Sequence, residues 1–233
     1  MRTLGIIGGI GPESTIEYYR MIFARYREKR PDGSSPSIIV NSIDLKRMLD
    51  FVAAAQLEEL TGYLRVELER LKSAGSDLAL MAANTPHVVF DDLAQQVSMP
   101  LISIVEATCE SARARGLHRV GLIGTTFTMQ GQFYQKVFEA AGIAVVIPTT
   151  EHQAYVHDRY IRELVMGVIK SETRERLWGI VQQMRRHEAI DGVVLGGTEL
   201  SLIMKEEDSE GLPLLDTTRL HVEAAVAQLI EAA

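Results

Sequence analysis

Short apolar runs alternate with amphipathic segments along the whole chain. The runs lie in "TLGIIGG" (3–9), "DLALMAA" (77–83), "RVGLIG" (119–124) and "DGVVLGG" (191–197). Continuous apolar runs of this length that stop at small residues are typical of strands buried on both faces of a parallel sheet. We therefore expect a strand in each run, followed by a turn that leads into a helix.

The segments between these runs carry apolar residues at every third or fourth position, which predicts helices. One helix follows the first run, with Pro12 at its first position and Ser14 starting a capping box. Others are expected over 56–75, 172–187 and 218–232. The apolar stripes of the first three are Ile16, Tyr19, Phe23 and Tyr26; Leu57, Leu60, Leu64, Leu68 and Leu71; and Leu177, Ile180, Val181 and Met184.

The sequence contains an internal repeat. Three pairs of corresponding residues occur in the same order in both halves, 113 to 116 residues apart. The pairs are Gly8 with Gly124, Ala83 with Gly197, and Pro100 with Pro213. Such a repeat indicates an internal duplication. We expect an α/β fold of two pseudo-symmetric lobes, each with a mainly parallel sheet flanked by helices, and an active-site cleft between them. The expected lobes are 1–99 plus 212–233, and 100–211.

The hydrophobic content and the net charge indicate which classes of partner the protein can bind. The 233 residues are 46% hydrophobic, enough for a full core, and carry a net charge of −7. That charge argues against nucleic acid, because phosphate contacts need clustered Lys and Arg. No apolar run approaches the length of a membrane span, and the glycine-broken N-terminus does not fit a signal peptide. We expect a cytoplasmic protein that binds neither nucleic acid nor membrane.

Four turns follow the expected strands, at 8–15, 82–87, 124–128 and 196–200. Ligands of parallel sheets bind beyond the carboxyl ends of the strands. Gly9 lets backbone N–H groups approach a ligand, and a helix N-terminus favours an anion. Short hydroxyl and amide donors complete a lining that suits a small carboxylate. They are Ser14, Asn84, Thr85, Thr125, Thr128 and Thr198.

A nucleotide or a metal ion fits these turns less well. The chain has no P-loop motif with its lysine, and Ser14 stands where the dinucleotide fingerprint needs its third glycine. The spacing of His152 and His157 does not place both on one helical face, as a metal-binding H-E-x-x-H does. With Cys109 as the single cysteine there is no thiolate metal site either, so we expect no metal.

The four turns, in this order and spacing, resemble those of the aspartate/glutamate racemase family and of the wider group with glutamate and hydantoin racemases. The matching motifs are "GGIGPEST" (8–15), "NTPH" (84–87), "GTTFT" (124–128) and "GGTE" (196–199). The resemblance covers essentially the whole chain. It implies an interlobe active site, a homodimer, and proton transfer at an amino acid α-carbon with no cofactor such as PLP.

That reaction needs two acid–base groups on opposite faces of the α-carbon. The resemblance implies one cysteine before the Asn-Thr of the first half and another before the Thr-Glu of the second. Ala83 and Gly197 stand at these positions, and neither carries a titratable atom. Candidate substitutes are His87, because a histidine side chain ordinarily titrates near neutral pH, and Glu199. The structural alternatives are a histidine bonded to backbone and a carboxylate that caps the next helix.

We therefore expect an isomerase: an amino acid racemase or a diverged relative acting at the α-carbon of a small amino acid or dicarboxylate, without the two-cysteine mechanism. The alternative is a small-carboxylate-binding protein, or a lyase or isomerase, built on the same frame. Cys109 falls in an expected helix and is read as a packed thiol. Lys46, Arg47 and Arg159 are read as exposed charges, or else as partners for a substrate carboxylate.

Overall fold

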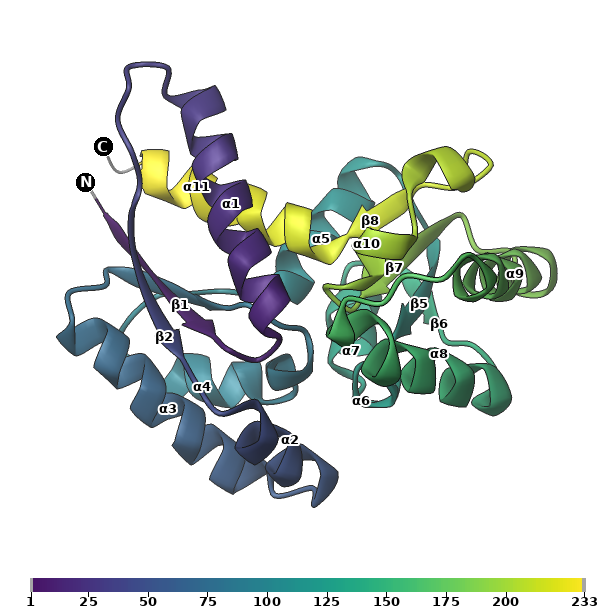
Figure 1. Ribbon diagram of the computed structural model, residues 1–233, viewed down its shortest axis with the longest axis horizontal. Helices are drawn as coiled ribbons and strands as arrows, with labels where there is room; N and C mark the ends of the chain where they lie inside the picture. The colour runs from purple at the N-terminus through teal and green to yellow at the C-terminus, as the bar shows by residue number, and fades with distance from the viewer. Residues whose placement is uncertain (1, 232–233) are drawn as a thin grey trace. The chain divides into compact units, whose positions relative to one another are not determined.

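The computed structural model describes residues 2–231 and divides the chain into two compact units. The first unit runs to Ile104 and resumes at His221; the second is Val105–Leu220. Each unit contains a four-stranded parallel sheet with helices packed on it (Figure 1). The α/β class and the two similar sheets agree with the sequence prediction.

The first sheet has the strand order β2-β1-β3-β4, and every strand pair in it is parallel. Its strands are β1 (Thr3–Gly8), β2 (Ser37–Ser42), β3 (Leu78–Met81) and β4 (Leu101–Ile102). The helices of this unit are α1 (Pro12–Lys29), α2 (Leu45–Ala53), α3 (Leu57–Ser73), the 3₁₀ helix η1 (Thr85–Val89), α4 (Phe90–Gln96) and most of α11 (Thr217–Glu231). In Figure 1, α1 and α11 cover one face of the sheet and α3 and α4 the other.

The second sheet has the order β6-β5-β7-β8, again all parallel, so corresponding strands of the two halves hold corresponding places. Its strands are β5 (Arg119–Gly124), β6 (Ala144–Val146), β7 (Gly192–Gly196) and β8 (Leu214–Asp216). The helices are α5 (Ile104–Ala114), α6 (Thr126–Gln130), α7 (Phe133–Ala140), α8 (Thr150–Arg162), η2 (Leu164–Met166), α9 (Ser171–Glu188), α10 (Leu200–Ile203) and η3 (Glu206–Asp208).

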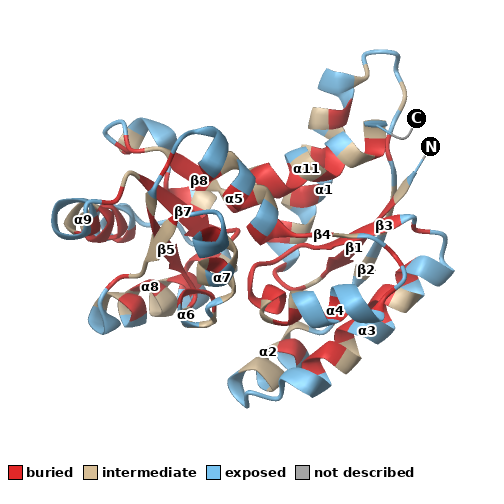
Figure 2. Ribbon diagram, turned by 180° about the vertical axis from the view of Figure 1, so that it is seen from behind, coloured by how far each residue is buried: buried red, intermediate tan, exposed pale blue. Residues whose placement is uncertain are grey.

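Each sheet is the centre of its own core (Figure 2). Side chains alternate along β1, so Leu4 and Ile6 pack with α1 and α11 while Ile7 packs with α2, α3 and α4. In the second unit, Val193 and Leu195 of β7 pack with α8, α9 and α10. Strands buried on both faces are what the unbroken apolar runs predicted.

The predicted helices are present, but the buried face of α1 differs from the predicted one. Tyr18, Ile22 and Tyr26 face the core, whereas Ile16 and Tyr19 are 45% and 48% exposed. Apolar residues lie on both faces of α1, the buried one and the exposed one. The face with Tyr18 can be buried because the Tyr18 hydroxyl hydrogen-bonds to Nδ1 of His221 at 2.9 Å. Spacing alone cannot rank two apolar rows on one helix.

The start of α1 and the start of α3 also differ in detail. Pro12 occupies the first turn as predicted, but the N-cap is Gly11 at φ +105 and Ser14 lies buried inside the first turn, so there is no capping box. Leu57 of the predicted α3 stripe is 40% exposed because it is the first residue of the helix. Within residues 2–231, no helix combines the length and the hydropathy that a membrane span requires.

Candidate functional site

The turn after β1 depends on a glycine backbone. Gly9 has φ +78, and a β-carbon there would lie 2.6 Å from the carbonyl oxygen of Ile43, so only glycine fits. The Gly9 N–H donates to Oγ1 of Thr15 at 2.9 Å, and that hydroxyl donates to the Gly11 carbonyl at 3.1 Å. The hydrogen bonds of Thr15 therefore fix the path of the chain into α1.

The neighbouring turn, after β3, contains most of the first unit's candidate residues. β1 and β3 are paired in the sheet, so the two turns lie at the same edge. Ala83 is 8% exposed and packs in the apolar cluster that includes Ile7. Asn84 and Thr85 follow, 4% and 9% exposed, and Thr85 begins η1. Nearly all of this turn is removed from solvent.

His87 is bonded to the backbone through both ring nitrogens. Nδ1 lies 2.9 Å from the Ala83 carbonyl oxygen, and the Ile104 N–H donates to Nε2 at 3.2 Å. A carbonyl only accepts and an amide only donates, so the ring is the neutral tautomer protonated on Nδ1. Burial, then the nearby His221, lowers the pKa of His87 to about 3. The geometry favours the structural alternative for this histidine: it holds the Ala83 turn.

In the second unit, the turn after β5 is closed by two threonines. Thr125 is the N-cap of α6: its Oγ1 accepts the Thr128 N–H at 3.2 Å and lies 3.1 Å from the Thr128 hydroxyl. The next amide, Thr126 N–H, donates to Nδ1 of His157 on α8 at 3.2 Å. Burial lowers the pKa of His157. The α8 helix thus reaches the end of β5.

The turn after β7 holds a buried carboxylate. Gly124 and Gly196 are paired across β5 and β7, so the two turns of this unit are also adjacent. Glu199 is 3% exposed, and its Oε2 accepts from the hydroxyls of Thr198, at 2.8 Å, and of Tyr160. Its side chain makes no capping bond to α10, so capping does not explain its position.

Tyr160 occupies the space beside Gly197. A β-carbon on Gly197 would lie 3.0 Å from Cζ and 3.1 Å from the hydroxyl oxygen of Tyr160, and closer still to Cε2. The sequence analysis missed this residue. The available signal was its position three residues after His157, which puts both side chains on one face of a helix.

The remaining candidates have other partners. Cys109 is buried in α5, with Sγ 3.8 Å from the Val137 carbonyl oxygen, and burial raises its thiol pKa. Lys46 pairs with Asp50 at 2.6 Å, Arg47 lies over the Tyr63 ring, and Arg159 pairs with Glu163 at 2.7 Å. Across the described part of the chain, no group of three or more His, Cys, Asp or Glu side chains is arranged for a metal ion.

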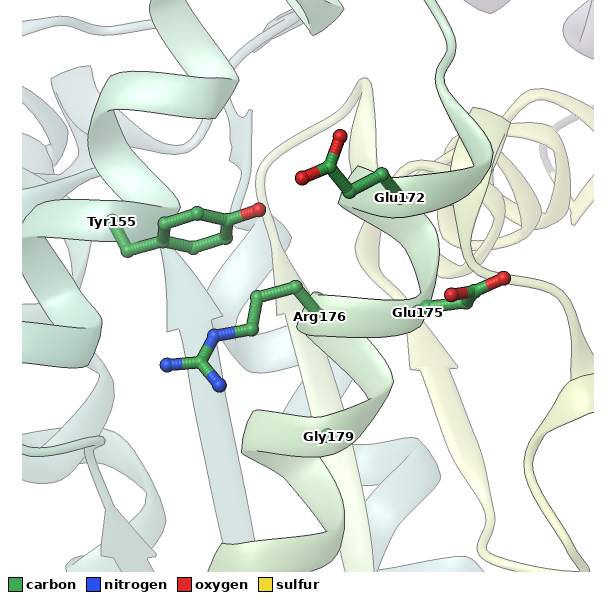
Figure 3. Close-up of a pocket in the computed structure, with 5 residues that line it drawn as sticks. All are labelled: Tyr155, Glu172, Glu175, Arg176 and Gly179. Atoms are coloured by element: carbon green, nitrogen blue, oxygen red, sulfur yellow. The ribbon is translucent and has the colours of Figure 1, made fainter.

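An open pocket of about 440 Å³ lies between α8 and α9 (Figure 3). Its lining is Tyr155, Glu172, Glu175, Arg176 and Gly179. Tyr160 follows Tyr155 by five positions, a rotation of about 140° around a helix. The two tyrosines therefore point away from each other, and this pocket is distinct from the strand-end residues.

Comparison with known proteins agrees with the fold and the turns. The Asp/Glu/Hydantoin racemase family model matches residues 7–225. The broad specificity amino-acid racemase RacX of Bacillus subtilis (strain 168) is 23% identical, with 96% of each chain aligned. A solved structure from Yersinia pestis is 30% identical, with 99% of this chain and 100% of that chain aligned and a TM-score of 0.90. An aspartate racemase homologue from Pyrococcus horikoshii OT3 is 34% identical, with 98% and 99% aligned and a TM-score of 0.85.

The fold is therefore that of these racemase-family structures, and each half of this chain repeats the same strand order. This chain belongs to the Asp/Glu/hydantoin racemase family. The name of the Bacillus relative describes that protein as an amino-acid racemase of broad specificity.

Proposed function

We propose that this chain catalyses proton exchange at the α-carbon of an amino acid, without a thiol at position 83 or 197. Family membership supports the reaction type. The observation that carries the proposal is Glu199, a buried carboxylate two residues after Gly197 at the end of β7. Its Oε2 accepts from the hydroxyls of Tyr160 and Thr198, so the carboxylate is held as a proton acceptor beside residue 197. The proposal requires no cofactor and no metal ion.

We assign the substrate's carboxylate to the donors of the strand-end turns. Deprotonation at an α-carbon places negative charge on that carboxylate, and fixed donors stabilise it at little cost in reorganisation. His87 serves this binding indirectly, because it holds the turn that carries Asn84 and Thr85. Within the first unit the proposed binding residues are Ser14, Asn84 and Thr85, and within the second unit they are Thr125 and Thr128; the Gly9 N–H and the Thr198 hydroxyl already donate to Thr15 and Glu199.

Exchange of the α-proton in D₂O tests the proposal directly. The protein is incubated with both enantiomers of aspartate, of glutamate and of a panel of neutral amino acids, and the Cα–H signal is followed by NMR. We expect the Cα–H signal of at least one amino acid to disappear as deuterium replaces its α-proton.

Two variants identify the source of any exchange. Glu199→Gln should lower the rate by about 10²–10⁴-fold, the usual contribution of an acid–base group. Glu175→Gln on the exposed face of α9 is the matched control and should leave the rate unchanged. Absence of exchange across the whole panel, in a folded protein, would refute the proposal. Line broadening without exchange would favour a carboxylate-binding protein.

We also propose a homodimer. Its support is the apolar face of α1, where the large side chains of Ile16 and Tyr19 are about half exposed and the Tyr19 and Phe23 rings lie 4.6 Å apart. Light scattering should give twice the chain mass of 25.9 kDa. Tyr19→Lys should shift the protein toward the monomer; a monomeric mass for the unmodified protein would contradict the proposal.

A further inference from the structure

Tyr160 and Gly197 fit together as a pair. The phenol ring of Tyr160 enters the core of the second unit from α8 and is 8% exposed. It takes the volume that any side chain on residue 197 would need, since such a side chain would meet Cε2, Cζ and the hydroxyl at or below contact distance. The ring edge and the hydroxyl of Tyr160 therefore occupy the space beside residue 197.

That hydroxyl is coupled to a carboxylate. Tyr160 donates to Oε2 of Glu199, and the Thr198 hydroxyl donates to the same oxygen at 2.8 Å. Burial, followed by the charge of Glu199, raises the pKa of Tyr160 well above its usual value. A free phenolate is thus disfavoured in the resting protein, and the phenol can give up its proton only as another proton arrives.

We propose that Tyr160 and Glu199 together form the proton-transfer group of the second unit, in place of a side chain at position 197. This inference rests on the proposed function and names the atoms that perform it. Glu199 accepts the proton of the Tyr160 hydroxyl and later returns it. Tyr160 is the group that faces the substrate, because it is the more exposed of the two and it stands beside Gly197.

The step balances as a concerted transfer of two protons. As the substrate Cα–H bond breaks, its electron pair remains on the substrate and the proton passes to the phenol oxygen. The O–H bond of Tyr160 breaks at the same time, and that proton passes to Oε2 of Glu199. The products are a substrate carbanion, a neutral phenol and a carboxylic acid. The acidic hydrogens of Tyr160 and Glu199 then exchange with solvent, and reversal of the two transfers returns a solvent proton to the same face of the α-carbon.

The geometry favours this pair over the other titratable groups of the strand-end turns. His87 uses both ring nitrogens on backbone atoms. Nδ1 of His157 accepts the Thr126 N–H and so cannot accept a substrate proton. Among these candidates, the Tyr160–Glu199 pair alone combines a hydroxyl that lies beside residue 197 with a carboxylate that accepts its hydrogen bond.

Tyr160→Phe tests the inference, because it keeps the ring beside Gly197 and removes only the hydroxyl. We expect α-proton exchange to fall by about 10²–10⁴-fold in kcat with little change in KM. Tyr155→Phe, on the opposite side of the same helix, is the matched control and should keep the full rate. Thermal unfolding of both variants establishes that they are folded.

A proton inventory in mixtures of H₂O and D₂O separates a chemical role from a structural one. The Cα–H proton comes from the substrate, so the Tyr160 hydroxyl proton is the one in flight that exchanges with solvent. The wild-type rate should fall linearly with deuterium fraction, and Tyr160→Phe should lose that dependence. Full exchange activity in Tyr160→Phe would overturn this inference and leave the proposed function standing. No exchange in the wild type on any amino acid would overturn the proposed function, and this inference with it.

Discussion

The ring of Tyr160 lies where a side chain on residue 197 would have to project. Residues 160 and 197 come from α8 and from the end of β7, so the packing joins two distant parts of the sequence. The space beside Gly197 is filled by a tyrosine whose hydroxyl has a partner in Glu199. A cysteine introduced at 197 would collide with that ring.

We predict that Gly197→Ala lowers the free energy of unfolding by about 1–3 kcal/mol, the usual cost of overpacking a tight core. Urea denaturation followed by fluorescence measures it, because the single tryptophan, Trp178, lies in the core cluster that contains Tyr160. Gly179→Ala is the matched control: nothing lies within 4 Å of its added β-carbon, and alanine favours a helix by roughly 0.5–1 kcal/mol. That control should be stabilising.

The same clash predicts a coupling between the two positions. In a Tyr160→Ala background the space beside Gly197 is open, so the additional cost of Gly197→Ala should be small. A double-mutant cycle should therefore give a coupling free energy of about 1–3 kcal/mol. Additive effects of the two substitutions would contradict the packing described here.

Cys109 should play no part in proton exchange. Its thiol is buried in α5, and burial raises its pKa, so little thiolate is present at neutral pH. Cys109→Ala should keep the full rate of α-proton exchange, and iodoacetamide should not inactivate the native protein. Inactivation by the reagent in step with labelling of Cys109 would contradict this and would revive a thiol mechanism.

The two buried histidines of the first unit should make its stability depend on pH. His221 binds the Tyr18 hydroxyl through Nδ1 and the Ile102 carbonyl through Nε2, both at 2.9 Å, and is neutral like His87. Burial is the largest cause of the lowered pKa of each, about 4 for His221 and about 3 for His87. The unfolded chain binds these protons at a higher pH than the folded chain does.

Stability should therefore be complete above pH 6.5 and fall as the pH drops from 6.5 toward 4, by up to about 1.4 kcal/mol per pH unit for each histidine. Urea titrations at pH 7, 6 and 5, followed by circular dichroism, measure the slope. His87→Gln and His221→Gln should each reduce the slope by one proton, whatever their stability at pH 7. A slope that neither variant changes would show that His87 and His221 are not the source of the pH dependence.

The sequence was informative about the fold for a clear physical reason. Strands buried on both faces must be apolar throughout, and parallel strands must be followed by helices, so the runs at 3–9 and 119–124 could be placed without any tertiary information. The choice between two apolar rows on α1 could not be made, because it depends on the partner that His221, more than 200 residues away, offers to Tyr18.

Only part of the candidate site could be predicted from the sequence, and the reason is related. Turns after strands could be located, since ligands collect there, and the lack of titratable atoms at Ala83 and Gly197 is visible in the sequence. Tyr160 could not be found in this way. The role proposed for it rests on a contact between α8 and the end of β7, and that contact exists only in the folded chain.

The last prediction concerns Glu163, which joins the end of α8 to the start of α9. Its carboxylate accepts from Arg159 at 2.7 Å, Lys170 at 2.9 Å and the Thr173 hydroxyl at 2.6 Å, and it is 3% exposed. The Thr173 hydrogen bond, then those of Lys170 and Arg159, lower its pKa to about 2. Glu163→Gln should cost about 1–3 kcal/mol of unfolding free energy, because the three donors lose a charged acceptor.

Because the folded pKa is lowered, the stabilisation should be complete above the usual pKa of 4.5 and lost as the pH falls from 4.5 toward 2. Trp178 fluorescence in urea at pH 7 and pH 3.5 measures both values. The control is Asp50→Asn, which breaks an ion pair whose side chains are 82% and 62% exposed and should cost less than about 1 kcal/mol at either pH. Equal costs for the two substitutions at pH 7 would mean that the burial of Glu163 adds nothing to its ion pairs.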